Sequence, residues 1–119
     1  MSSYNKQGVI ENYSVDVSTT AGNWTPQWQE NASTLITIKG SFGIAFLKFV
    51  RAGAPIKMPK ERGRQGVFDV YYEASIADTM IDILRNESPV RFYYFEMDSF
   101  NSAGVTTGDE QPGEEESSS

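Results

Sequence analysis

A glycine- and proline-containing stretch, residues 51–64, carries a cluster of cationic side chains and lies between segments rich in aromatic residues. Cationic side chains bind phosphates by replacing the counterions condensed around a nucleic acid. Aromatic rings on neighbouring strands provide flat surfaces on which unpaired bases stack. Together, these residue types predict an interface for single-stranded nucleic acid. The residues that we expect to contribute are Phe46, Lys48, Arg51, Lys57, Lys60, Arg62, Arg64, Tyr71, Arg91 and Tyr93.

The basic residues are concentrated in one window of a chain that is acidic overall. Residues 39–64 hold seven Lys or Arg residues and a single acid, Glu61, although the formal net charge of the whole chain is −6. A second interpretation of these residues is that the charges aid solubility while the aromatic rings fill the core. The two interpretations differ in whether the rings are exposed, which depends on the strands that carry them.

The parity of the predicted strands places rings and cations on the same faces. Phe46 and Lys48 share one face of a strand, and Arg91 and Tyr93 share one face of a later strand. A small barrel buries one face of each strand, so we expect the faces that carry cations to point outward. Exposed apolar surface of this kind typically marks an interface.

The elements that would position these residues are mainly strands. Alternating or β-branched apolar residues predict strands at residues 9–17, 34–39, 44–51, 67–73 and 90–97. Apolar residues at helical spacing predict one helix that begins with a capping box at Ser75. The helix should end near Asn86, because Pro89 disfavours helical backbone in the residue before it.

The order of these elements predicts a mainly β fold with one helix. It resembles the small OB-like five-stranded β-barrel, in which a helix lies between the third and fourth strands. The fifth strand would be either the one at residues 9–17 or a short one after Met97. Another small α+β sheet or barrel is the alternative.

The acidity of the chain lies in its C-terminal segment. Residues 109–116 hold five acidic residues, which leaves the rest of the chain close to neutral. Residues 102–119 consist largely of Ser, Gly, Thr and Glu, and such a segment buries too little apolar surface to offset its ordering entropy. We therefore expect a β-barrel domain at residues 1–101 and a disordered acidic tail at residues 102–119.

This layout of a nearly neutral body with one basic window and an acidic tail resembles the single-stranded DNA-binding proteins of bacteria and phages. The resemblance implies that the tail competes with DNA for the basic surface. In that family the tail also recruits partner proteins through an aromatic or hydrophobic tip, whereas this tail ends in Glu and Ser only. The resemblance therefore implies electrostatic competition more directly than partner recruitment.

The composition excludes several classes of chemistry. The chain has no Cys and no His, which removes thiol nucleophiles, disulfides, Cys/His zinc sites and Ser-His-Asp triads. Asp78 and Asp82 are one helical turn apart but have no third ligand in register. We therefore expect a binding protein without a cofactor or metal rather than an enzyme.

The expected partners are single-stranded DNA or RNA and, as an alternative, other protein subunits. The longest apolar run, residues 44–47, is too short to span a bilayer, and the N-terminus has no apolar signal core. We expect a soluble cytoplasmic protein, in the host cytoplasm if a phage encodes it. In the alternative, the chain is a structural or oligomeric interaction protein, such as a phage particle component or an adaptor, and its surplus aromatic residues pack against another subunit or a second copy.

Overall fold

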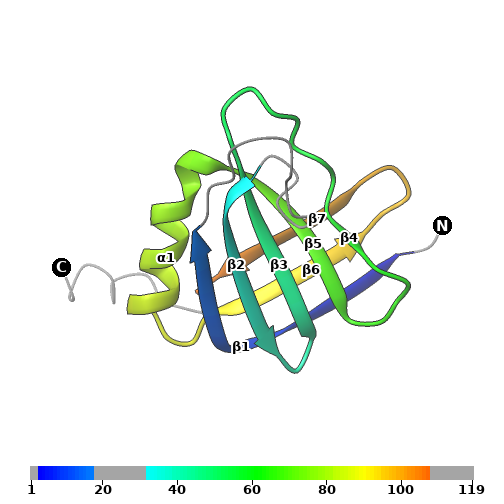
Figure 1. Cartoon of the computed structure of the whole chain (residues 1–119). Helices are drawn as coiled ribbons and strands as arrows, with labels where there is room; N and C mark the ends of the chain where they lie inside the picture. Colours follow the sequence, from blue (N-terminus) through cyan, green and yellow to red (C-terminus); the bar gives the residue numbers. More distant parts are fainter. Residues whose placement is uncertain (1–2, 18–31, 108–119) are drawn as a thin grey trace, which may run out of the picture.

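The computed structural model describes residues 3–17 and 32–107. Within these ranges the chain forms seven strands, one short 3₁₀ helix and one α-helix (Figure 1). Their bounds are β1 Tyr4–Val17, β2 Ala32–Gly40, β3 Gly43–Val50, β4 Lys60–Glu61, β5 Val67–Glu73, η1 Ala74–Ile76, α1 Ala77–Asn86, β6 Arg91–Glu96 and β7 Asn101–Thr106.

The long strand β1 is shared between two sheets. Its N-terminal half, up to Val9, pairs with β6, and its C-terminal half, from Ile10, pairs with β2. The register is irregular between Ile10 and Asn12, where the strand passes from one partner to the other. The strand order is β4-β5-β3-β2-β1-β6-β7. Because β1 is shared, one sheet has three strands (the N-terminal half of β1, β6 and β7), and the other has five (β4, β5, β3, β2 and the C-terminal half of β1).

The five-stranded sheet contains a parallel pair. β2 and β3 form an antiparallel hairpin, whereas β3 and β5 run parallel, with Ile44 opposite Val67 and Val50 opposite Glu73. Parallel neighbours need a crossover of about a dozen residues or more. Residues 51–66, which include β4, form this crossover.

The core lies between the inner faces of the two sheets. Its centre is aromatic. The centre of the Phe92 ring lies 4.7 Å from the centre of the Phe42 ring and 5.2 Å from the centre of the Phe68 ring. The helix α1 lies beside the C-terminal half of β1 and adds Met80 and Leu84 to the core (Figure 1). Among the described residues, no helix is long and apolar enough to cross a membrane.

Polar contacts join the segment around β4 to β6 and β7. Arg64 donates hydrogen bonds from both terminal nitrogens to the Glu96 carboxylate, at 2.9 and 2.8 Å, and the Tyr94 hydroxyl also donates to Glu96. The Asn101 side-chain amide donates to the Pro59 carbonyl at 3.0 Å. The sheet is therefore nearly closed into a barrel by side chains rather than by a strand ladder.

The fold class agrees with the sequence prediction, but the strand count does not. The chain is mainly β with one helix in a nearly closed, barrel-like sheet, and it has seven described strands rather than five. Both candidate fifth strands exist, and β4 interrupts the long basic loop. The predicted capping box does not form, because Ile76 occupies the N-cap of α1 and makes no side-chain hydrogen bond there.

The boundary predicted for the tail also requires correction. Residues 102–106 belong to β7, which pairs with β6 along its whole length. The small residues of β7 suit this position, since Gly104 lies directly beneath the Tyr93 ring. The body therefore extends at least to Thr106, and the acidic residues predicted as a disordered tail, 109–116, lie outside the described residues.

Candidate nucleic-acid interface

The register of the five-stranded sheet assembles most of the predicted binding residues on its outer face. Phe46 of β3 lies opposite Asp69 of β5, which in turn lies opposite Lys60 of β4. Lys48 of β3 lies opposite Tyr71 of β5. The residues between them on these strands point inward, where Leu47, Phe49, Phe68 and Val70 are buried in the core.

Cations and aromatic rings are interleaved on this face. The guanidinium carbon of Arg62 lies 5.3 Å from the centre of the Phe46 ring. The ammonium groups of Lys48 and Lys57 lie 5.2 and 5.7 Å from the centre of the Tyr71 ring. These separations are within the range of cation–π attraction, so each ring is accompanied by at least one positive charge.

Asp69 holds two of these cations in place. Arg62 donates two hydrogen bonds of 2.7 Å to its carboxylate, and the Lys48 ammonium lies 3.2 Å from Oδ1. Burial by itself raises the pKa of Asp69, but the hydrogen bonds from Arg62 and the charge of Lys48 outweigh burial and lower that pKa. The carboxylate is therefore a fixed negative centre beneath the surface.

Lys48 does not lie where a ligand can reach it. Its side chain is only 2% exposed, although the sequence parity correctly places it on the outer face. The buried ammonium group contacts Asp69 and Tyr71. Its role here is to position those two residues, and the expectation that it contacts nucleic acid directly is corrected.

Acid is expected to destabilise the protein through Asp69. Because the pKa of Asp69 is lower in the folded state than in the unfolded state, its stabilisation is present above the ordinary carboxyl pKa, about 4, and is lost as the pH falls below it. The difference in thermal unfolding temperature between the unmodified protein and Asp69→Asn should narrow as the pH falls from about 6 to about 3. Circular dichroism would measure this difference, and a constant gap across that range would contradict the assignment.

The remaining cations of this face are accessible. Lys57, Lys60 and Arg62 are exposed, and Lys39 of β2 adds a further exposed cation next to Ile44. Sequence reasoning included Lys39 in the basic window but did not select it, although its parity with Thr37 could have identified it. We call Lys39, Phe46, Lys57, Lys60, Arg62 and Tyr71 the cation–ring surface.

Arg51 is exposed at the start of the crossover, and the carboxylates of Asp16 and Glu73 lie at the margin of the same face.

Arg64 lies apart from the cation–ring surface. Besides its two hydrogen bonds to Glu96, its guanidinium carbon lies 3.7 Å from the centre of the Tyr4 ring and one nitrogen lies 3.5 Å from the buried Glu61 carboxylate. These hydrogen bonds from Arg64, with a further one from Tyr94, lower the pKa of Glu96. The contacts of Arg64 therefore close the barrel.

Arg91 and Tyr93 lie on the outer face of the three-stranded sheet. Tyr93 stacks on Phe95 with ring centres 6.2 Å apart, and Phe100 packs edge-on against Phe95 at 6.1 Å. The core separates this sheet from the cation–ring surface. The structure thus brings six of the ten predicted residues to one face, including the buried Lys48, and leaves Arg51, Arg64, Arg91 and Tyr93 elsewhere.

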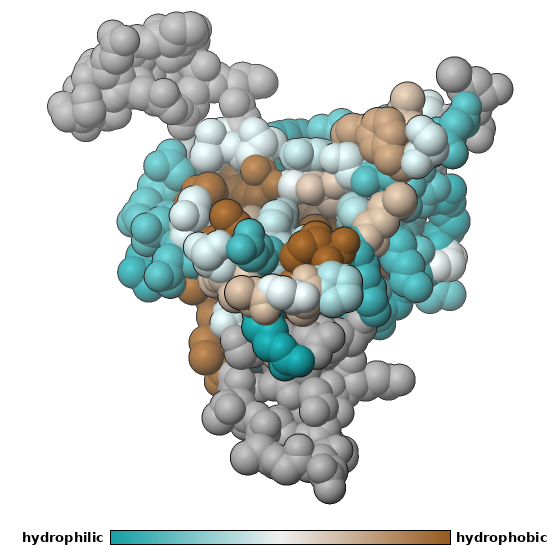
Figure 2. Space-filling model, turned by 90° about the horizontal axis from the view of Figure 1, so that it is seen from above, coloured by the Kyte–Doolittle hydropathy of each residue, from teal (hydrophilic) through white to brown (hydrophobic). Residues whose placement is uncertain are grey.

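The crossover adds apolar side chains close to these cations. Ile56 and Met58 are 53% and 54% exposed, among the most exposed large hydrophobic residues of the described chain. Figure 2 views the molecule from the top of Figure 1, where the crossover lies, and shows hydrophobic residues in separate islands among hydrophilic ones. This mixture of apolar and charged side chains suits a ligand that is itself part apolar and part charged.

No arrangement within residues 3–17 and 32–107 brings together three acidic side chains that could hold a metal ion. No protein-family model, curated protein or solved structure matches this chain.

Proposed function

We propose that this protein binds single-stranded nucleic acid on the cation–ring surface. The observation that carries the proposal is the interleaving of cations and rings on one face, with Arg62 over Phe46 and Lys57 over Tyr71. Phosphates require cations and unpaired bases require flat surfaces. On this face, cations of the crossover lie beside rings of the neighbouring strands β3 and β5.

The Asp69 contacts support a defined role for Arg62. Two hydrogen bonds hold its guanidinium plane beside the Phe46 ring. Unpaired bases stack on guanidinium planes as well as on aromatic rings. A base could therefore stack on the Arg62 guanidinium, which itself lies over the Phe46 ring. The exposed ammonium groups of Lys57 and Lys60 would then contact the phosphates on either side.

The proposal favours single strands of any sequence over duplexes. Stacking is tolerant of sequence because every base has an aromatic face, and the bases of a duplex are already stacked on one another. No helix or paired strand projects from this face to enter a major groove, at least within the described part of the chain. We therefore expect weak sequence preference and a strong dependence on salt.

The test is a fluorescence anisotropy titration of the full chain with labelled oligothymidine. The logarithm of affinity should fall with the logarithm of salt concentration by about 0.7 for each phosphate contact. The double variant Lys57→Glu/Lys60→Glu should bind at least about tenfold more weakly, with a shallower salt dependence.

The matched control carries the same change of charge elsewhere. Lys6→Glu/Arg85→Glu alters two exposed cations on β1 and α1, outside the cation–ring surface. It should retain most of the affinity of the unmodified chain. Equal losses in the two double variants would show a general charge effect, and absence of binding at low salt would overturn the proposed function.

The outer face of the three-stranded sheet favours a second candidate function, as an oligomeric interaction protein. Its specific observation is the row formed by Tyr93, Phe95 and Phe100. Aromatic rings are enriched in protein interfaces. Sedimentation equilibrium would distinguish this candidate, since a stable oligomer that dissociates on Phe95→Ser would support it and a monomer would exclude it.

A further inference from the structure

The C-terminal half of β1 has one edge that pairs with no described strand. β6 pairs with β1 only as far as Val9, and β2 occupies the opposite edge from Ile10 to Val17. No Lys, Arg or Pro, the residues that commonly protect such edges, occurs between Asn12 and Val17. Within the described part of the chain, no strand therefore pairs with the backbone groups on this edge.

The inward-facing side chains of the same segment are only partly covered. Tyr13 and Val15 lie opposite the fully buried Ile38 and Ile36, which places them on the core face of the sheet. They are nevertheless 36% and 37% exposed, and Val17, farther along, is 74% exposed. The core face of the five-stranded sheet thus extends to β1, but the side chains of β1 are less covered than those of β2 at the centre of the sheet.

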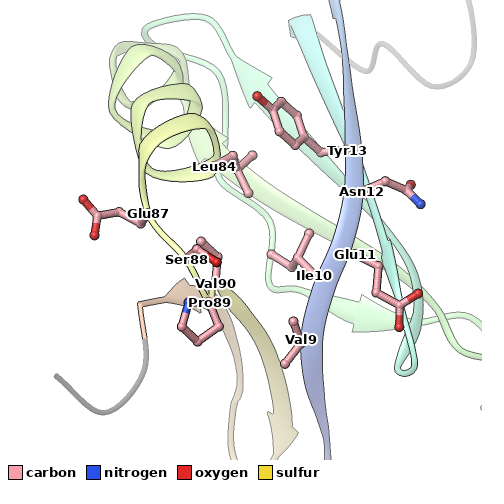
Figure 3. A pocket seen from close by; sticks show the side chains of 10 residues that line it. All are labelled: Val9, Ile10, Glu11, Asn12, Tyr13, Leu84, Glu87, Ser88, Pro89 and Val90. Atoms are coloured by element: carbon pink, nitrogen blue, oxygen red, sulfur yellow. The ribbon is translucent and has the colours of Figure 1, made fainter.

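A groove of about 420 Å³ separates this edge from the end of α1. Figure 3 shows Tyr13 and Ile10 extending from β1 toward Leu84 of α1, with Pro89 and Val90 at the lower end of the groove. Glu11 and Asn12 point to the other side of the strand (Figure 3). The groove therefore has apolar walls on both the strand and the helix.

The rim of the groove is acidic. Glu11 and Glu87 belong to its lining, and none of its ten lining residues is Lys or Arg. Asp16, farther along β1 and on the outer face of the strand, is also exposed. These carboxylates disfavour nucleic acid and favour a cationic occupant.

From these observations we propose that the β1 edge binds an extended, positively charged peptide segment of a partner protein by strand addition. The added strand would pair with β1 along Asn12–Val17. Its inward side chains would be apolar and pack against Tyr13 and Val15, and its outward side chains would be basic and approach Asp16. Backbone hydrogen bonds supply affinity in this mode of recognition, and alternating side chains supply specificity.

Charge also decides against a second copy of the chain as the occupant. Antiparallel pairing of β1 with its own copy would bring two acidic rims into one seam. Like charges so placed oppose association. A basic strand, in contrast, would place its outward cations on the side of β1 that carries Glu11 and Asp16. The proposed surface adjoins the face of the cation–ring surface at Asp16, but the proposal does not depend on nucleic-acid binding.

The probe is an acetylated, fluorescein-labelled peptide of sequence Lys-Val-Lys-Val-Lys-Val-Lys, titrated into the full chain by anisotropy. Two control peptides are used, one with Glu in place of Lys and one with Pro in place of the central Val. Both should bind at least about tenfold more weakly, because one reverses the charge and the other removes a backbone donor. The Pro peptide keeps every positive charge, so equal binding of it would indicate charge attraction alone and overturn the proposal.

Protein variants and hydrogen exchange locate the binding. Val15→Lys should weaken binding of the Lys-Val peptide at least about tenfold, whereas Ile56→Lys, which changes an exposed apolar residue of the crossover, should not. The peptide should slow amide exchange in residues 11–17. Protection elsewhere, or self-association of the chain through this edge in sedimentation, would overturn the proposal, and the Pro-peptide comparison remains decisive if Val15→Lys fails to fold.

Discussion

Replacing Asp69 by alanine is expected to lower the free energy of unfolding by about 3 kcal/mol. The substitution removes the carboxylate that lies 3.2 Å from the Lys48 ammonium, and the Lys48 side chain is only 2% exposed in the unmodified protein. It also removes both hydrogen bonds that orient Arg62. Removing one partner of a buried ion pair is costly because the other charge remains buried. Urea denaturation with linear extrapolation would measure the loss.

The control for this substitution removes the buried charge as well. In Lys48→Met/Asp69→Ala the cation is replaced by an apolar side chain of similar length, so much of the lost stability should return. If the free energy of unfolding of Asp69→Ala were within about 0.5 kcal/mol of that of the unmodified protein, the Lys48–Asp69 ion pair would not contribute to the stability of the sheet. The double variant should also bind oligothymidine more weakly, since Arg62 loses the carboxylate that orients it.

Gly43→Ala is expected to lower the free energy of unfolding by about 3 kcal/mol or more. The φ angle of Gly43 is 124°, a value that side-chain-bearing residues rarely adopt. An added Cβ would lie 2.1 Å from the Gly66 carbonyl oxygen. That oxygen accepts the 2.8 Å hydrogen bond from the Ile44 amide, at the start of the parallel pair. The clash cannot be relieved by moving a flexible side chain.

Gly53→Ala is the matched control for this prediction. Gly53 also has a positive φ angle, 86°, but nothing lies within 4 Å of an added Cβ. Its substitution should cost only the backbone strain, about 1 kcal/mol. Thermal unfolding followed by circular dichroism resolves the difference, since 1 kcal/mol corresponds to about 4–8 °C in a domain of this size. Equal shifts for the two variants would contradict the close approach at Gly66.

Much of the fold was predictable because local patterns and tertiary packing agree. β5 occupies the residues predicted from the alternation of Phe68, Val70 and Tyr72, which are all on the core side. β7 was anticipated only as an alternative short strand after Met97, with most of its residues assigned to the tail, because Ala103 and Val105 are its only apolar residues of any size. Its position as an end strand beside β6 lets it fold with so little apolar surface. Sequence patterns detect buried strands better than such end strands.

The candidate site was only partly predictable because burial depends on which strands become neighbours. Parity placed Phe46 and Lys48 together on the outer face, but it could not show that Asp69 lies beside them. One signal was present, since the crossover of residues 51–66 is long enough for a parallel connection between β3 and β5. The separation of Tyr93 from Phe46 follows from the passage of β1 from one sheet to the other, which no local pattern reveals.

Because β1 pairs with β2 in one half and with β6 in the other, we expect it to fold in two stages. The C-terminal half of β1 can pair with β2 once residues near Thr34 have been synthesised. The N-terminal half can pair only after β6 has been synthesised, because Tyr4 pairs with Glu96. Contacts between residues so far apart in sequence form slowly, because loop closure precedes them. During synthesis the five-stranded sheet can therefore assemble while β6 is still within the ribosome. For that interval the N-terminal half of β1 is an unpaired strand exposed to chaperones and to neighbouring nascent chains.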